Sequence, residues 1–402
     1  MKTKLVLATL LAGNLIARAA DFTAHEWGTF TSVQGADGIQ LEWNPLVTTD
    51  LPKFVYDRNR PNANARGQAF REYVAKSAFV SLQRMETPVI YFYADKELTV
   101  DVNVRFPQGL VTEWYPQTTP STNRQTRWSK VTVLPRAKDP ALLPNDGSKT
   151  HYYAARETEA AILRVPAQDK KVEHEKFLFY RGIGSFRAPL TVSMGANEDY
   201  LQLHNSDTNE LRHLFVLQVR GPVARLTRIN HLRNSEPRSI KLSRDEKPVV
   251  EVRQEIADAM RDALVSEGLY GPEAAAMVET WRDSWFGEQG MRVLYVLPRT
   301  WADRTLPLSI EPAPKDIVRV MVGRAEIITP SMEWDLMKQI VKFSEGDSEA
   351  VARLQALGMG RFADAAVRRM LGRTPSPDFS RAAWNLLETA LREPSTAKLA
   401  AK

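Results

Sequence analysis

The sequence contains no cysteine among its 402 residues. This absence excludes disulfide bonds, thiolate metal sites, a catalytic thiol and the lipidated cysteine of a bacterial lipoprotein. The fold must therefore be stabilised by burial of apolar side chains, and a hydrophobic content of 43% over this length is enough for a large core. The length predicts two or three domains.

Long hydrophobic runs are also missing, apart from one near the start at residues 5–16. That run is too short to cross a bilayer, which takes roughly 20 apolar residues. It follows Lys2 and Lys4 and precedes the small-residue site Ala17-Arg18-Ala19, which is the pattern of a secretory signal peptide. We therefore predict a signal peptide at 1–19 and a soluble, periplasmic or extracellular protein without a transmembrane segment.

The chain has little excess charge. Its formal net charge is +6, and removal of the three basic residues of the signal leaves +3. No uninterrupted basic run of the kind that binds nucleic acid occurs. Together with export, this predicts that nucleic acid is not a partner.

The common catalytic signatures are absent as well: there is no Gly-x-Ser-x-Gly, no Walker loop, no Gly-x-Gly-x-x-Gly and no His-Glu-x-x-His. The two His-Glu pairs, at 25–26 and 174–175, have Thr29 and Leu178 where a zinc protease has its second histidine. The sequence therefore predicts no cofactor and no metal site.

Short alternating runs dominate residues 20–231 and predict antiparallel strands. The clearest run is 98–106, in which every second residue is apolar. Strands at this spacing are typical of two packed sheets, so we predict an α+β protein with an N-terminal β-sandwich-like region.

Beyond 231 the pattern changes. Residues 232–248 are charged and poor in large apolar side chains, which predicts a linker, and residues 249–330 combine helical periodicity with two strand-like runs. Residues 331–392 are predicted to form a helical C-terminal region, and 393–402 a disordered tail.

The segment HEWGTFT, which begins at His25, is the most unusual one. In a strand, His25 and Trp27 lie on one face and Glu26 on the other. One interpretation places Trp27 and Phe30 in the core, with His25 bonded to the backbone. The other makes His25 a binding residue or Glu26 an acid in a site completed by distant strands.

Two further segments carry candidate residues. In FYRGIG, Arg181 ends a strand beside two glycines. Its guanidinium can bind a carboxylate or phosphate through two N–H groups. The other interpretation is a glycine turn with an arginine in a structural ion pair. Glu113 precedes Trp114 and Tyr115. One interpretation is an acid beside two aromatic rings that bind a sugar, and the other places the two rings in the core.

Helical spacing places Trp281 and Trp285 on one buried face, with Arg282 on the solvent side. The alternative makes Asp283 a catalytic acid. His204 and His213 are the one histidine pair that we expect on neighbouring strands.

The segments HEWGTFT, METPVIYFY, FYRGIG, TWRDSWF, RVLYVLPR and RVMVGR resemble an uncharacterised family of exported bacterial proteins. They run from residue 25 to 324 and so cover most of the mature chain. The resemblance implies export and bacterial origin, and it implies no activity.

These observations favour a binding or scaffolding protein of the bacterial envelope, whose partner is an envelope polymer or another protein. The alternative is a secreted hydrolase that uses Glu26 or Glu113 together with Arg181.

The intact mass of the exported protein should correspond to a chain that begins at Ala20, because Ala17 and Ala19 are the small residues that a signal peptidase requires. A chain that begins at His25 would contradict this prediction. It would also provide the terminal amine and imidazole that a copper brace needs.

Overall fold

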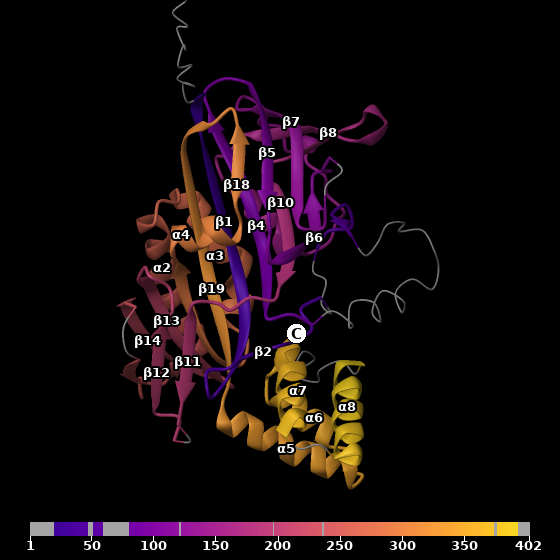
Figure 1. Ribbon diagram of the computed structural model, residues 1–402, viewed down its shortest axis with the longest axis vertical. Coiled ribbons are helices and arrows are strands. Elements are labelled where there is room, and N and C mark those ends of the chain that lie inside the picture. Colours follow the sequence, from indigo (N-terminus) through magenta and orange to yellow (C-terminus); the bar gives the residue numbers. More distant parts are fainter. Residues whose placement is uncertain are drawn as a thin grey trace, which may run out of the picture.

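The computed structural model describes residues 20–46, 51–58, 80–119, 122–195, 197–234, 237–373 and 376–392. The predicted signal peptide at 1–19 and the predicted tail at 393–402 lie outside these ranges. Within them the protein is α+β, as predicted, with large sheets toward the N-terminal side and helices at the C-terminal end (Figure 1).

The centre of the molecule is a mixed sheet of eleven strands. Its strands are β1 (Ala20–Gly35), β2 (Gln40–Leu41), β3 (Tyr56–Asp57), β4 (Gln83–Ala94), β6 (Gly109–Tyr115), β10 (Leu178–Gly184), β13 (Leu211–Arg220), β14 (Val223–Leu232), β16 (Lys247–Pro248), β17 (Gly290–Leu297) and β19 (Pro314–Ile328). They are ordered β16-β14-β13-β17-β19-β1-β4-β10-β6-β3, with β2 paired to β1. The long strand β1 lies in the middle, parallel to β19 and antiparallel to β4.

Two smaller sheets pack on one face of this central sheet. One contains β18 (Leu308–Glu311), β5 (Leu98–Arg105), β7 (Gln125–Leu134), β8 (Ile162–Pro166) and β9 (Val172–Glu175), and the other contains β11 (Leu190–Met194), β12 (Tyr200–Asn205) and β15 (Arg238–Lys241). Apolar side chains of all three sheets form one buried cluster, to which the alternating residues Val100, Val102, Val104 and Phe106 belong. The predicted sandwich-like packing is therefore present.

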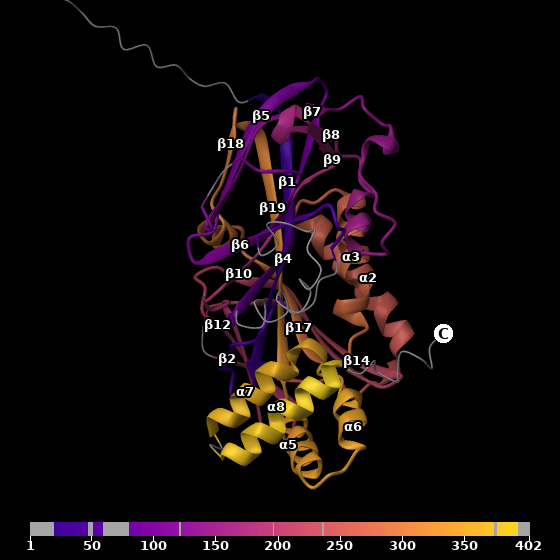
Figure 2. The same ribbon diagram turned by 90° about the vertical axis from the view of Figure 1, so that its right-hand side faces the viewer.

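Among the described residues, the α-helices are α2 (Val249–Ser266), α3 (Gly271–Phe286), α4 (Arg299–Thr305), α5 (Pro330–Ser344), α6 (Ala350–Ala356), α7 (Ala363–Arg373) and α8 (Pro377–Arg392). All of them except α4 cover the opposite face (Figure 2). Helix α4 instead packs with Trp301 and Ala302 into the cluster shared by the three sheets. Short 3₁₀ helices are η1 (Pro140–Leu142), η2 (His151–Arg156), η3 (Gln168–Lys170) and η4 (Gly360–Phe362).

The helical layer has two separate apolar cores. Helices α2 and α3 pack as a hairpin over the cluster that contains Trp27 and Val322 from the sheet. Helices α5 to α8 pack over a second cluster, at the end of β1 and β19, that contains Val33 and Ile328. The stretch of sheet between these two cores is where charged side chains gather.

The boundary predicted at 232–248 does not divide the central sheet. Strands β13 and β14 precede it and β17 follows it, yet β13 pairs with both β14 and β17. The predicted linker itself contains β15, which pairs with β12, and β16, which pairs with β14. A charged composition is normal for edge strands, because their side chains face water, and here it was misread as a linker.

No helix among the described residues is both long and apolar enough to span a membrane.

Trp281 is 4% exposed and stacks on Trp285 with ring centroids 6.1 Å apart, as the helical spacing predicts. Replacement of Trp281 by alanine should lower the free energy of unfolding by about 3 to 5 kcal/mol, because it leaves a cavity. Arg282 makes a surface ion pair with Glu279 at 3.5 Å, so Arg282→Ala should cost less than about 1 kcal/mol. Denaturant unfolding of both variants checks this, and equal losses would show that Trp281 is not a core residue.

Candidate functional site

A row of charged side chains crosses the helix-covered face of the central sheet between the two helical cores. We name this row the arginine band. It consists of Arg84, Glu86, Glu113, Arg181, Glu288, Arg292, Arg324, Glu326 and Arg361. Four of the five arginines are no more than 2% exposed, which is rare for this residue type unless it has a specific partner.

Strand register brings the band together. On β19 and β1, Arg324 lies opposite Thr31, and Thr31 lies opposite Arg84 on β4. At the edge of the sheet, Arg181 on β10 lies opposite Glu113 on β6. Side chains opposite one another in a sheet share a face, so residues distant in sequence become neighbours.

Two bulges lie at the level of the band. Between its pairs with β1, strand β4 has two residues, Thr87 and Pro88, where β1 has only Gly28. Strand β6 has one extra residue, Thr112, relative to β10. Each bulge is next to a glutamate of the band, Glu86 or Glu113, and bulges change the direction in which neighbouring side chains point.

Thr87 has a positive φ of 51° and is buried. This conformation is unfavourable for a β-branched residue, and such strain often occurs at functional sites.

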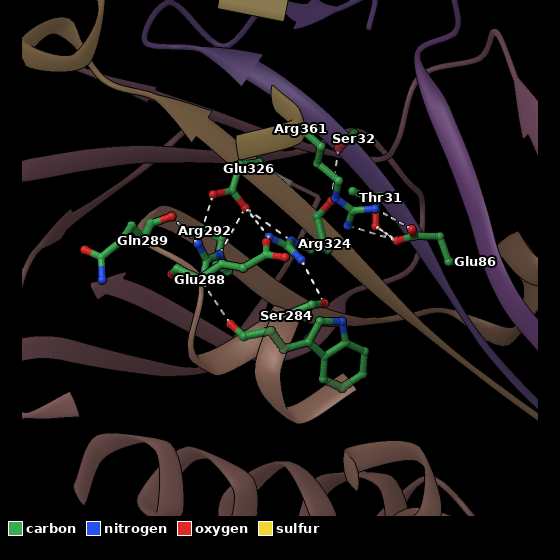
Figure 3. A network of polar contacts seen from close by, with 11 residues as sticks. Thr31, Ser32, Glu86, Ser284, Glu288, Gln289, Arg292, Arg324, Glu326 and Arg361 are labelled. Carbon is green, nitrogen blue, oxygen red and sulfur yellow. Dashed lines mark hydrogen bonds and ion pairs between the residues drawn. The ribbon is translucent and has the colours of Figure 1, made fainter. Parts of the chain in front are cut away.

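The first half of the band is an arginine and glutamate network (Figure 3). Arg292 donates to both carboxylate oxygens of Glu326, at 3.0 and 3.1 Å. Arg324 donates to Glu326 at 2.9 Å and to Glu288, two residues after the end of α3, at 2.6 Å. Burial by itself lowers the pKa of Arg324, but Glu288 and Glu326 outweigh it and hold the pKa above its usual value.

The second half is centred on Glu86, which is 2% exposed. Its carboxylate accepts bonds from Arg361 and from the Thr31 hydroxyl, both at 2.6 Å, and Arg84 lies 3.4 Å away. Burial raises the pKa of Glu86, but Arg361, Arg84 and Arg181 outweigh it and hold the pKa well below its usual range. Glu86 is therefore a fixed anion and not a proton donor at neutral pH.

Arg361 connects the C-terminal helices to the band. Its guanidinium lies over the rings of Trp43 and Phe362, 5.6 and 4.9 Å from their centroids. The guanidinium of Arg324 lies 5.1 Å from the centroid of the same Phe362 ring. One aromatic ring thus contacts a cation from the sheet and a cation from η4, and this brings both halves of the band together.

Polar atoms without a hydrogen-bond partner border the band within the described part of the chain. They are the Thr29 hydroxyl and the N–H groups of Trp43 Nε1, Trp285 Nε1 and Arg361 Nε. Thr29 lies opposite Glu86 and is fully buried. A buried polar atom without a partner costs about 1 to 3 kcal/mol, so a cluster of them calls for a ligand or water in the functional state.

Among the residues predicted from sequence, Arg181 and Glu113 belong to the band. Glu26 does not, because it projects from the other face of β1. There it accepts bonds from Tyr180 at 2.5 Å and from Arg319 at 2.6 Å. Glu26 and Arg181 are therefore on opposite faces of the sheet, so the predicted combination of these two residues does not form a site.

His25 lies on the face opposite to Glu26, as predicted, but its partner is a side chain rather than the backbone. Its Nδ1 is 2.7 Å from the buried carboxylate of Glu273, which also accepts from the Tyr93 hydroxyl at 2.8 Å and caps α3 at Tyr270. The ring of Tyr270 lies 4.4 Å from the imidazole. His25 thus joins β1 to the start of α3.

Trp114 and Tyr115 do not form an open platform. Tyr115 is 4% exposed and packs against Phe54 at 4.8 Å between ring centroids. Trp114 stacks with Tyr56, with ring centroids 6.3 Å apart. The guanidinium carbon of Arg58 lies 5.1 Å from the centroid of the Trp114 ring. Both rings are covered by neighbouring side chains.

The remaining candidates do not form a site. Asp283 is an exposed partner of Arg253. His204 and His213 lie in different sheets, on β12 and β13. Among the described residues, no group of three or more His, Cys, Asp or Glu side chains is placed to hold a metal ion.

Most of the band was missed from sequence. A signal was present, since Arg-x-Glu occurs in two apolar strands, as Arg84-Met-Glu86 and as Arg324-Ala-Glu326. Residues two apart in a strand share a face, so each pattern places a cation and an anion side by side on a buried surface.

No protein-family model matches the chain, and no curated protein matches it. Among solved structures, the Fcho1 mu homology domain of Danio rerio with a bound Eps15 peptide aligns with a TM-score of 0.32 and 8% identity, covering 77% of this chain and 98% of that domain. The yeast delta-COP-I mu-homology domain complexed with a Dsl1 WxWxV peptide aligns with a TM-score of 0.30 and 7% identity, again covering 77% of this chain and 98% of that one. Likenesses this weak carry no conclusion about fold or function.

Proposed function

We propose that the chain is an exported binding protein and that the arginine band is its site for an anionic ligand with carboxylate or phosphate groups. The observation that carries this proposal is the set of partnerless polar atoms beside buried arginines: three N–H donors and the Thr29 hydroxyl. A ligand that satisfies them must bring hydrogen-bond acceptors, and the arginines favour acceptors with negative charge.

The energetic cost of the band supports a functional role. Buried ion pairs lose much of their Coulomb energy to desolvation, and apolar residues of similar size often give equal or greater stability. The strands that carry the band have apolar residues above and below it, such as Val322 and Ile328 on β19. By this general tendency, the fold itself does not require a charged row at this position.

The alternative of a secreted hydrolase has less support. Two carboxylates that cleave a glycosidic bond must flank the substrate on one surface. Glu26 and Glu113 instead lie on opposite faces of the sheet, and Glu86 is held ionised by three arginines. The binding interpretation uses all of these charges without requiring any of them to transfer a proton.

The proposal is tested by thermal unfolding of the mature protein with increasing inorganic phosphate or citrate. We expect at least one of these anions to stabilise the protein, by about 2.7 kcal/mol when its concentration is 100 times its dissociation constant. Arg361→Gln should raise that dissociation constant at least tenfold, because this side chain carries a partnerless N–H and a charge beside Glu86.

The matched control is Arg373→Gln, which changes the same charge on the same part of the chain. The side chain of Arg373 is 54% exposed, and its partners among the described residues are Asp37 and Glu333 at the surface. Its substitution should leave anion binding within about twofold of the original. If neither anion stabilises the protein, or if both variants respond equally, the arginine band is not an anion site.

A further inference from the structure

Strand β19 has an open edge along its first half. Its antiparallel pairing with β17 ends where Leu297 lies opposite Met321. From that point back to Asp316, no strand of the described chain lies on this side of β19, although β1 continues along the other side. A strand with one unpaired edge offers a row of main-chain hydrogen-bond donors and acceptors.

A proline explains why β17 stops at this point. Pro298 has no N–H to donate to β19, and it begins helix α4 as the N-cap residue. The side chain of the next residue, Arg299, turns back and donates to the carbonyl of Ile317. The main chain of Ile317 therefore faces the open side. In a paired strand the N–H and C=O of one residue point the same way, and every second residue repeats this, so Ile317 and Arg319 each offer a donor and an acceptor there.

A slot follows this edge, and we name it the edge slot. The end of α2 forms one wall, where Gly268 lies so close to β19 that a Cβ added to it would be 3.2 Å from the side chain of Val318. The start of α4 forms the other wall, to which Arg319 is bonded through Asp303 at 2.8 Å. The slot has a volume of about 160 Å³, and all residues from 316 to 320 line it. An adjoining cavity of about 310 Å³ extends it past the end of β17 to the start of β13.

The side chains that border the edge slot are apolar and acidic. Ile317 and Val318 are half-buried. Glu267 lines one wall and is only partly neutralised, since its nearest arginine, Arg212, is 3.5 Å away. Asp316 is exposed at the open end and forms no ion pair with the described residues. The slot therefore suits an occupant with apolar groups and a positive charge.

We infer that the edge slot binds a linear peptide segment with a basic side chain, which adds to the open edge of β19 as a further strand. The pattern of main-chain groups identifies the occupant. A donor and an acceptor that recur at every second residue match the main chain of an extended peptide, whereas lipids and sugars lack this pattern. The peptide displaces the guanidinium of Arg299 from the carbonyl of Ile317. This surface is separate from the arginine band, so the inference would hold if the band bound no anion.

The test begins with a phage-displayed library of random linear peptides of about nine residues, selected against the mature protein. We expect enriched sequences that alternate apolar and polar residues and contain lysine or arginine. The best peptide is synthesised, and its affinity is measured by isothermal titration. Two further versions carry N-methyl groups, one version on the odd amides and the other on the even amides. Because only the amides that face β19 donate to it, one version should lose at least tenfold in affinity and the other should bind within about threefold of the parent peptide.

Variants of the protein assign the binding to the edge slot. Ile317→Pro removes the N–H on the open side and leaves the pairing with β1 intact, since proline is tolerated where the amide faces away from the ladder. It should weaken the best peptide at least tenfold. The matched control is Ile317→Val, which retains the N–H and should bind within about twofold of the original protein.

Replacement of Arg299 by alanine should act in the opposite direction. The carbonyl of Ile317 is then already available, so the affinity should rise at least threefold. Arg304→Ala removes the same charge from the same helix, but Arg304 pairs with Asp207 outside the slot, and this variant should bind as the original does.

Three results would overturn the inference: no enriched peptide, equal binding of the two N-methylated versions, or equal affinity of Ile317→Pro and Ile317→Val. Unfolding midpoints show whether each variant is folded. The comparison of the two N-methylated peptides uses the unchanged protein, so it remains decisive even if Ile317→Pro does not fold.

Discussion

Charges buried on a sheet must be neutralised by specific partners, and this constraint shapes the helix-covered face of the protein. Glu86 pairs with Arg84 on β4, and Glu326 pairs with Arg292 on β17 and Arg324 on β19. On β10, Arg181 lies opposite Glu113 of β6. Glu288, just after α3, and Arg361 from η4 complete the row. The charged row therefore fixes where the helical layer divides into two cores.

The same constraint links parts of the chain that are far apart in sequence. Strand β1 begins the described structure and contributes Thr29 and Thr31 to the row, whereas Arg361 comes from the C-terminal helices. The contact of Arg361 with Glu86 and Trp43 means that these helices are docked partly by charge and aromatic stacking, in addition to their apolar core.

Sequence patterns predicted the local structure well, because period-two alternation and helical spacing reflect burial on one side. The strand at 98–106, the buried pair Trp281 and Trp285, and the opposite faces of His25 and Glu26 all followed from spacing alone. Pairing between distant strands was not predictable, since no local signal states that β17 and β19 lie between β13 and β1. That pairing creates the band, so Arg181 and Glu113 were found individually while Arg324, Arg292 and Arg361 were missed.

The most direct test of the band as a binding site is the free energy of unfolding of Thr29→Val, measured with and without the stabilising anion. Valine keeps the volume of threonine and removes a buried hydroxyl that has no partner. Without anion the variant should be more stable than the original by about 1 kcal/mol, and its stabilisation by the anion should be smaller. A variant that is less stable without anion, and that responds to the anion as the original does, would show that the band serves only the fold.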